Sequence, residues 1–185
     1  ILVFGMSLAG SVVEEKQSRI VEIIAAAIPV RHLLAGKVIG NTILAAAQMA
    51  LYLTVGLIGL GLTRHGDLLP SLSGSVAWFG VFFLAGFIAL SCMWAVAGAL
   101  ASRSEDLQST ATPVSMLVIA VFFVGLSLQG SYQVIGSYVP PFSAVLMPIR
   151  LLSGTAAWWE PVIALALLLV FAAVMGLTFL STVPP

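Results

Sequence analysis

The chain has 185 residues, of which 61% are hydrophobic and 8% are charged, and seven basic residues balance seven acidic ones. A soluble globular domain is about a quarter charged, so this composition excludes an ordinary water-soluble fold and favours a chain surrounded by lipid. The net charge of zero gives no electrostatic support to a nucleic-acid partner, and the single cysteine excludes an internal disulfide.

The first apolar run covers residues 1–13. It is shorter than the ~20 residues that a membrane-spanning helix needs, and it lacks the basic segment and cleavage site of a signal peptide. We expect it to be a truncated span, the end of a membrane helix that begins in an earlier part of a longer protein.

Charged residues are concentrated in the next segment, residues 14–37, and they are Glu14, Glu15, Lys16, Arg19, Glu22, Arg31 and Lys37. Apolar residues between 20 and 28 recur with helical spacing, which predicts a short amphipathic helix that Glu14 and Glu15 begin and Pro29 ends. Such a helix either joins two spans at the membrane surface or presents a charged face to a soluble partner. The spacing alone does not separate these two interpretations.

Four longer apolar runs are each sufficient to cross a bilayer. They cover residues 38–62, 75–101, 109–129 and 161–183. The tryptophans Trp158 and Trp159 precede the last run, as expected of an interfacial aromatic anchor. The predicted fold is therefore all-α, a polytopic transmembrane helix bundle with four complete spans and one truncated span in a single domain.

The distribution of basic residues predicts the orientation. Five of the seven lie in the first and third loops, against two in the second and fourth. Because the excess of Lys and Arg belongs on the cytoplasmic side, we expect the first loop and the C-terminus to face the cytoplasm. The preference for Arg over Lys and the abundance of Ala, Gly, Val and Leu favour a GC-rich bacterial gene, and we expect the protein in a bacterial plasma membrane.

Three polar side chains, Asn41, Gln48 and Gln129, fall inside the predicted spans. We interpret them as interhelical hydrogen-bonding groups, with contact to a transported substrate as the alternative. Gly36 and Gly40 have the spacing of a close helix contact. No charged residue lies at the centre of a span, which argues against a proton- or ion-coupled carrier.

Residues 130–157 are too rich in proline and glycine to span the membrane. We expect an external segment that dips into the outer leaflet as short re-entrant helices packed against protein. Arg150 and Glu160 are candidates for an external ion pair or gate, and a solvated loop is the alternative.

The chain carries no recognisable catalytic or metal site. Gly36 and Lys37 are followed by Val38 rather than Ser or Thr, and position 31 is Arg rather than Gly, so the phosphate-binding loop of an ATPase is not formed. We therefore expect a protein that is not an enzyme and that binds no cofactor itself.

Three motifs in order resemble the permease subunits of type-2 ABC transporters, and among them the NatB-like sodium and drug exporter branch. The first is Val13-Glu14-Glu15-Lys16-Gln17-Ser18-Arg19-Ile20-Val21-Glu22-Ile23-Ile24, with Leu33-Leu34-Ala35-Gly36-Lys37 after it. The second is Ala101-Ser102-Arg103-Ser104-Glu105-Asp106-Leu107-Gln108. The third is Tyr138-Val139-Pro140-Pro141-Phe142-Ser143, with Met147-Pro148-Ile149-Arg150 and Trp158-Trp159-Glu160 after it.

This resemblance implies an export subunit that acts with a separate ATPase. ATP and Mg²⁺ would bind to that ATPase, and the 14–37 segment would dock against it as a coupling element. A second permease half, or a second copy of the chain, would complete the pathway across the lipid. A non-transporting membrane scaffold or assembly protein, and a stand-alone channel or carrier, remain the alternatives.

Overall fold

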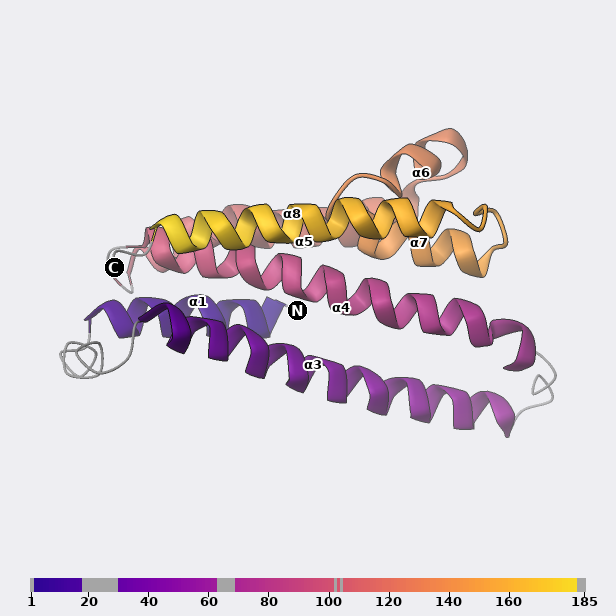
Figure 1. Ribbon diagram of the computed structural model, residues 1–185, viewed down its shortest axis with the longest axis horizontal. Coiled ribbons are helices and arrows are strands. Elements are labelled where there is room, and N and C mark those ends of the chain that lie inside the picture. Colours follow the sequence, from indigo (N-terminus) through magenta and orange to yellow (C-terminus); the bar gives the residue numbers. More distant parts are fainter. Residues whose placement is uncertain (1, 18–29, 63–68, 102, 104, 183–185) are drawn as a thin grey trace.

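A computed structural model describes residues 2–17, 30–62, 69–101, 103 and 105–182. Every regular element within these residues is an α-helix. The helices are α1 (Leu2–Gln17), α3 (Val30–Gly61), α4 (Leu69–Leu100), α5 (Leu107–Ser127), α6 (Gly130–Gly136), α7 (Ser143–Leu152) and α8 (Glu160–Thr182). They lie side by side as an elongated bundle from which α6 projects (Figure 1).

Four of the described helices are long and apolar enough to cross a membrane. Their candidate spans are Val38–Gly61, Gly74–Leu100, Leu107–Ser127 and Glu160–Phe179. Leu2–Glu14 forms a shorter apolar helix. The prediction of a polytopic helical bundle is confirmed, and the predicted spans agree with the observed ones to within a few residues.

The long helix α4 runs through the middle of the bundle and contacts α1, α3, α5, α7 and α8. Near its C-terminal end, Trp94 is fully buried in a core cluster with Leu8 and Val12 of α1 and Val114 of α5. Near the middle of α4, Phe82 lies in a second core cluster with Met147 of α7 and Leu168 of α8. These two clusters hold α1, α5, α7 and α8 around α4.

The helix α7 lies alongside α4 rather than beyond its end. A methyl group at Gly86 of α4 would stand 2.5 Å from the Cβ of Ala144, and the Ser75 hydroxyl donates to the carbonyl oxygen of Leu151 over 3.4 Å. Both contacts fall within the candidate span Gly74–Leu100. This is the arrangement expected of a re-entrant helix, while the depth of α7 in a membrane stays a prediction.

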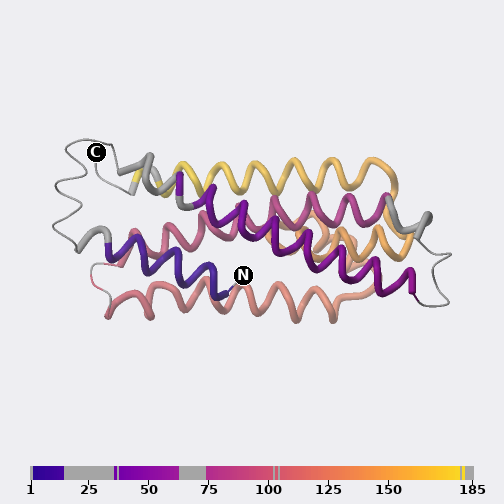
Figure 2. Tube along the Cα trace, turned by 90° about the horizontal axis from the view of Figure 1, so that it is seen from below, coloured from indigo at the N-terminus to yellow at the C-terminus, as the bar shows by residue number. Residues whose placement is uncertain are grey.

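The bundle has two distinct ends (Figure 2). At the first, which we name the Gln17 end, α1 and α4 finish and α3 and α5 begin. At the second, the Glu160 end, α3 and α7 finish and α4 and α8 begin. The short helix α1 begins near the middle of the bundle's length, whereas α3 and α4 run between both ends.

One expectation about helix ends is wrong, and one about glycines is not supported by a described contact. Glu14 and Glu15 lie in the last turn of α1 instead of starting a separate helix, because no proline or glycine interrupts the chain between Val12 and Gln17. Gly36 and Gly40 have no close helix contact among the described residues, where a methyl group at either position would meet nothing within 4 Å, so their role in helix packing stays a prediction.

Candidate functional site

The strongest concentration of polar contacts in the described part of the chain surrounds Arg150, in the last turn of α7. This helix buries Leu146 and Met147 against the bundle, and Arg150 follows Met147 by three residues, so helical spacing places it on the same buried side. Only 2% of Arg150 is exposed. A fully buried arginine requires partners for its charge and its hydrogen-bond donors, because moving an unpaired charge out of water has a high free-energy cost.

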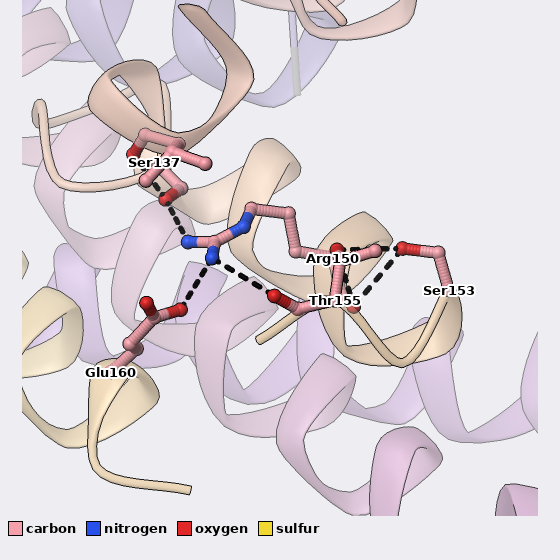
Figure 3. A network of polar contacts seen from close by, with 6 residues as sticks. Ser137, Arg150, Ser153, Thr155 and Glu160 are labelled. Atoms are coloured by element: carbon pink, nitrogen blue, oxygen red, sulfur yellow. Dashed lines mark hydrogen bonds and ion pairs between the residues drawn. The ribbon is translucent and has the colours of Figure 1, made fainter. Parts of the chain in front are cut away.

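The guanidinium of Arg150 joins three separate segments (Figure 3). Its Nη1 donates to the Ser137 hydroxyl, just after α6, over 2.8 Å. Its Nη2 donates to the carbonyl oxygen of Thr155, after α7, over 3.2 Å, and pairs with Oε2 of Glu160, the first residue of α8. One side chain therefore connects the end of α6, the turn after α7 and the start of α8.

The backbone of Arg150 takes part in the same junction. Its carbonyl oxygen accepts a hydrogen bond from the backbone N–H of Thr155 over 3.0 Å, and the N–H of Gly154 donates to the carbonyl of Leu151 over 3.2 Å. This pair of bonds is a Schellman motif, which ends a helix through a residue with positive φ. Gly154 has φ of 68°, a conformation that suits glycine. The turn therefore fixes the C-terminal end of α7, the part of the helix that carries Arg150.

The charge of Arg150 is balanced by a carboxylate that is itself largely buried. The side chains of Arg150 and Glu160 are 3% and 13% exposed. Glu160 is the first residue of α8, where the positive end of the helix dipole also stabilises a carboxylate. Burial of the phenol, together with the negative charge of Glu160, raises the pKa of Tyr138 above its ordinary value. Tyr138 therefore remains a neutral phenol at the edge of this junction.

The predicted ion pair between Arg150 and Glu160 is present in the structure, and its role as a gate stays a prediction. No sequence pattern pointed to Ser137 or Thr155, because small hydroxyl residues in a broken segment have no distinguishing spacing. The hydrogen bonds and the ion pair of Arg150 hold the end of α6, the end of α7 and the start of α8 together.

The residues predicted to couple to a partner are only partly described. Glu14 is exposed in the last turn of α1, and Glu15 and Lys16 follow it in the same helix. Arg31 and Lys37 occupy positions near the start of α3. Arg19 and Glu22, with the amphipathic helix predicted around them, lie outside the described residues. The described positions are all near the Gln17 end, and their docking role stays a prediction.

The three predicted polar residues of the spans do not form one site. Gln48 donates to the hydroxyl of Tyr52 over 2.7 Å within α3, so its bond is made inside one helix rather than between two. Asn41 is half-buried on the same helix. Gln129 is exposed and lies outside the span that ends at Ser127, because the extended backbone at Leu128 and the positive φ of Gly130 turn the chain there.

Two apolar cavities share part of their lining and are open to the outside, since Val3, Tyr52 and Phe123 in their linings are exposed. One, of about 730 Å³, lies between α1, α3 and α4, and its lining includes Gln48 and Tyr52. The other, of about 780 Å³, lies between α1, α4, α5 and α7. Phe79, Phe83 and Phe87 of α4 line both, and their successive ring centroids are 6.4 and 6.3 Å apart. Neither lining contains a charged residue from the described part of the chain.

Comparison with known proteins gives one family and one distant relative. Residues 1–180 match a family described as "ABC-2 family transporter protein". The chain is also 25% identical over 193 residues to the uncharacterized protein YhaP of Bacillus subtilis (strain 168). This similarity covers 95% of the present chain and 46% of YhaP, so the chain spans about half the length of that relative. No solved structure matches the chain.

The family match covers nearly the whole chain, and it agrees with the four candidate spans and the helical bundle. The motifs that resembled a type-2 permease all lie within the matched residues. The chain is thus a multi-pass membrane protein and belongs to the ABC-2 family of transporter membrane proteins.

Proposed function

We propose that this chain forms the membrane pathway of an ATP-driven exporter and is powered by a separate ATPase subunit. The observation that carries the proposal is the family match over residues 1–180. The absence of a phosphate-binding loop from the sequence supports a division of labour, in which ATP and Mg²⁺ bind to the partner. A second permease half, either identical or related, would complete the pathway.

The 14–37 segment would receive the force from the ATPase. The Gln17 end holds the described basic positions Lys16, Arg31, Lys37 and Arg103, which supports a cytoplasmic location for this end by the positive-inside rule. Glu14 adds an exposed acidic side chain there. In a bacterial plasma membrane, with the C-terminus inside, this end would face a cytoplasmic ATPase.

The NatB-like branch is proposed on the three sequence motifs alone. We do not propose sodium as the substrate, since the two described cavities are lined almost entirely by apolar side chains. An ion transferred into such surroundings would lose its hydration without gaining oxygen ligands.

Cross-linking tests the partnership. Full-length permease with Cys92→Ala and Glu22→Cys is treated in its host membrane with a thiol-to-amine cross-linker, then extracted in mild detergent. We expect capture of a protein with ATPase activity. A matched variant with Ser131→Cys, which replaces an exposed residue of α6 instead, is the control and should not capture it.

A folded, monodisperse permease that captures no ATPase in the presence or absence of nucleotide would contradict the proposal. Substrate flux in liposomes without nucleotide would then identify a stand-alone channel or carrier. Capture of a partner without any flux would identify a scaffold.

A further inference from the structure

The cavity of about 730 Å³ between α1, α3 and α4 has an aromatic side, which α4 provides. Phe79, Phe83 and Phe87 follow one another at every fourth residue of this helix, so helical spacing places their rings on one face. The planes of successive rings differ by 31° and 23°, and Phe4 of α1 meets Phe87 edge-on, with ring centroids 6.2 Å apart. Such a row of rings suits a flat aromatic molecule, which can stack on one ring while it meets the edge of the next.

The α3 side of the same cavity carries two hydrogen-bonding side chains, Gln48 and Tyr52. The amide of Gln48 donates to the hydroxyl oxygen of Tyr52 over 2.7 Å. The hydroxyl proton of Tyr52 and the carbonyl oxygen of Gln48 have no partner in the part of the chain that the structure describes, so one can donate and the other can accept a further bond. Both residues lie inside the candidate span Val38–Gly61, where hydrocarbon offers no such partner. A polar group on a ligand would therefore be held here.

Charge and size limit what this cavity can hold. Its described lining contains no acidic or basic residue, so a charged molecule would lose its hydration without gaining a counter-charge. Its volume falls within the range of about 300–1,000 Å³ that is usual for small-molecule sites. It is open at Val3 and Tyr52, which are 81% and 64% exposed. A small apolar molecule that has partitioned into the bilayer can therefore enter it.

We propose that this cavity binds an uncharged, flat aromatic molecule with one hydrogen-bonding end group, and that molecules of this class are substrates of the exporter. Gln48 and Tyr52 hold the end group, and the rings of α4 hold the flat body. The inference rests on the proposed transport function and adds the substrate class and its site. An apolar lining with a few polar groups close together is the usual composition of a small-molecule site. A saturated lipid chain fits less well, because it cannot use the ring edges and faces or the polar pair.

The first test measures binding in the absence of any ATPase. Purified full-length permease in lipid nanodiscs is dialysed against tritiated 1-naphthol, a flat and uncharged molecule with one hydroxyl group. Empty nanodiscs give the amount that dissolves in lipid. We expect saturable binding to the permease and about tenfold weaker binding of decahydro-1-naphthol, which keeps the hydroxyl but has no aromatic ring. The charged analogue 1-naphthoate should not compete, because the cavity offers it no counter-charge.

Single substitutions test the location. Tyr52→Phe removes only a hydroxyl group and Phe83→Leu removes the middle ring, and we expect each to weaken the binding of 1-naphthol about fivefold. Tyr132→Phe is the control for the first, since Tyr132 is an exposed residue of α6 that lines neither cavity. Phe122→Leu is the control for the second, since Phe122 lines only the 780 Å³ cavity. Both controls should bind 1-naphthol as the unmodified protein does.

The second test asks whether the bound molecule acts as a substrate. 1-Naphthol is added to the complex of full-length permease and ATPase in nanodiscs, and the rate of ATP hydrolysis is measured. We expect the rate to rise with the concentration of 1-naphthol. The half-maximal concentration should be about fivefold higher for Tyr52→Phe and unchanged for Tyr132→Phe.

The outcomes separate the binding site from the proposed function. Absence of saturable binding, the result if a lipid chain or another part of the full-length protein fills the cavity, would overturn the site. Equal binding of 1-naphthol and its decahydro analogue would overturn the aromatic class, and equal effects of Phe83→Leu and Phe122→Leu would overturn the location. Binding that leaves ATP hydrolysis unchanged would overturn the assignment as substrate. Failure of the unmodified permease to bind any ATPase would instead remove the export function, while the dialysis experiment would still test the site.

Discussion

Gly98 of α4 lies against the backbone of Ala9 of α1: a methyl group at position 98 would stand 2.7 Å from the Ala9 carbonyl oxygen and 3.0 Å from its Cα. Ala9 is fully buried, and Val12 lies next to the same position. Because the nearest atoms belong to backbone, they cannot rotate away as a flexible side chain would. The α1–α4 interface therefore depends on a small residue at position 98.

Replacing Gly98 by valine should separate α1 from α4 and lower the stability of the bundle by about 1–3 kcal/mol, the usual effect of overpacking. The measurement is thermal unfolding of the purified full-length protein in detergent. Gly40→Val is the matched control, since no described atom lies within 4 Å of a methyl group at Gly40. Equal unfolding temperatures for the two variants would contradict the close contact.

Removing Arg150 should leave Glu160 buried without its partner. We expect Arg150→Ala to lower the free energy of unfolding by about 3–5 kcal/mol, as found when one member of a buried pair is lost. Arg103→Ala is the control, because Arg103 is exposed and makes no ion pair with a described residue. Thermal unfolding in detergent measures both, and a loss no larger than that of the control would show that the pair does not hold the junction.

The spans were predictable because hydrophobic length is a property of sequence alone. A run such as residues 38–62 can be surrounded by lipid without any knowledge of its neighbours, and α3 accordingly ends at Gly61. Helix ends are less predictable. Gln129 follows the apolar run directly, yet α5 ends at Ser127, because the turn that begins at Leu128 depends on how α6 is placed.

Of the residues in the polar junction around Arg150, only the two charged ones were predictable from the sequence. Arg150 and Glu160 stand out in a chain with few charged residues, and their pairing follows from the high energy of either one alone in apolar surroundings. Ser137 and Thr155 contribute one hydroxyl and one backbone carbonyl. Their positions depend on the geometry of α6 and of the turn after α7, and neither can be read from local pattern.

Glycine contacts were the least predictable part of the fold. Gly36 and Gly40 have the spacing of a helix contact and yet meet no described neighbour, whereas Gly86 and Gly98 pack closely. A spacing rule describes one helix, but close packing requires a partner at the correct height and rotation. The central position of α4 supplies such partners, and the edge position of α3 does not.

Reversing the charges of Glu15 and Glu22 should uncouple ATP hydrolysis from transport while leaving membrane insertion intact. The physical reason is that like charges would then face each other wherever these residues meet basic groups of the ATPase. The measurement compares ATP hydrolysed with substrate moved in proteoliposomes. Reversal at Glu105, an exposed acidic residue between α4 and α5, is the control. Unchanged coupling in the Glu15 and Glu22 variant would assign the segment to a purely connecting role.

The orientation is testable with single cysteines on the Cys92→Ala background. Glu105→Cys lies at the Gln17 end and Ser131→Cys lies on α6, and both positions are exposed. We expect an impermeant maleimide added to intact cells to label only the cysteine at 131, because the excess of basic residues marks the opposite end as cytoplasmic. Labelling of the cysteine at 105 alone would show that the chain has the opposite orientation in the membrane.

The central helix α4 touches α1, α3, α5, α7 and α8, and this has a consequence for how the bundle can move. Because five helices contact this one, we expect a rearrangement that keeps these contacts to occur as small rotations or shifts of the helices against α4. The Gly86 and Gly98 contacts fix where α7 and α1 are seated along it. Since α4 runs between both ends of the bundle, a shift of this helix at the Gln17 end would be transmitted along its length to the Glu160 end.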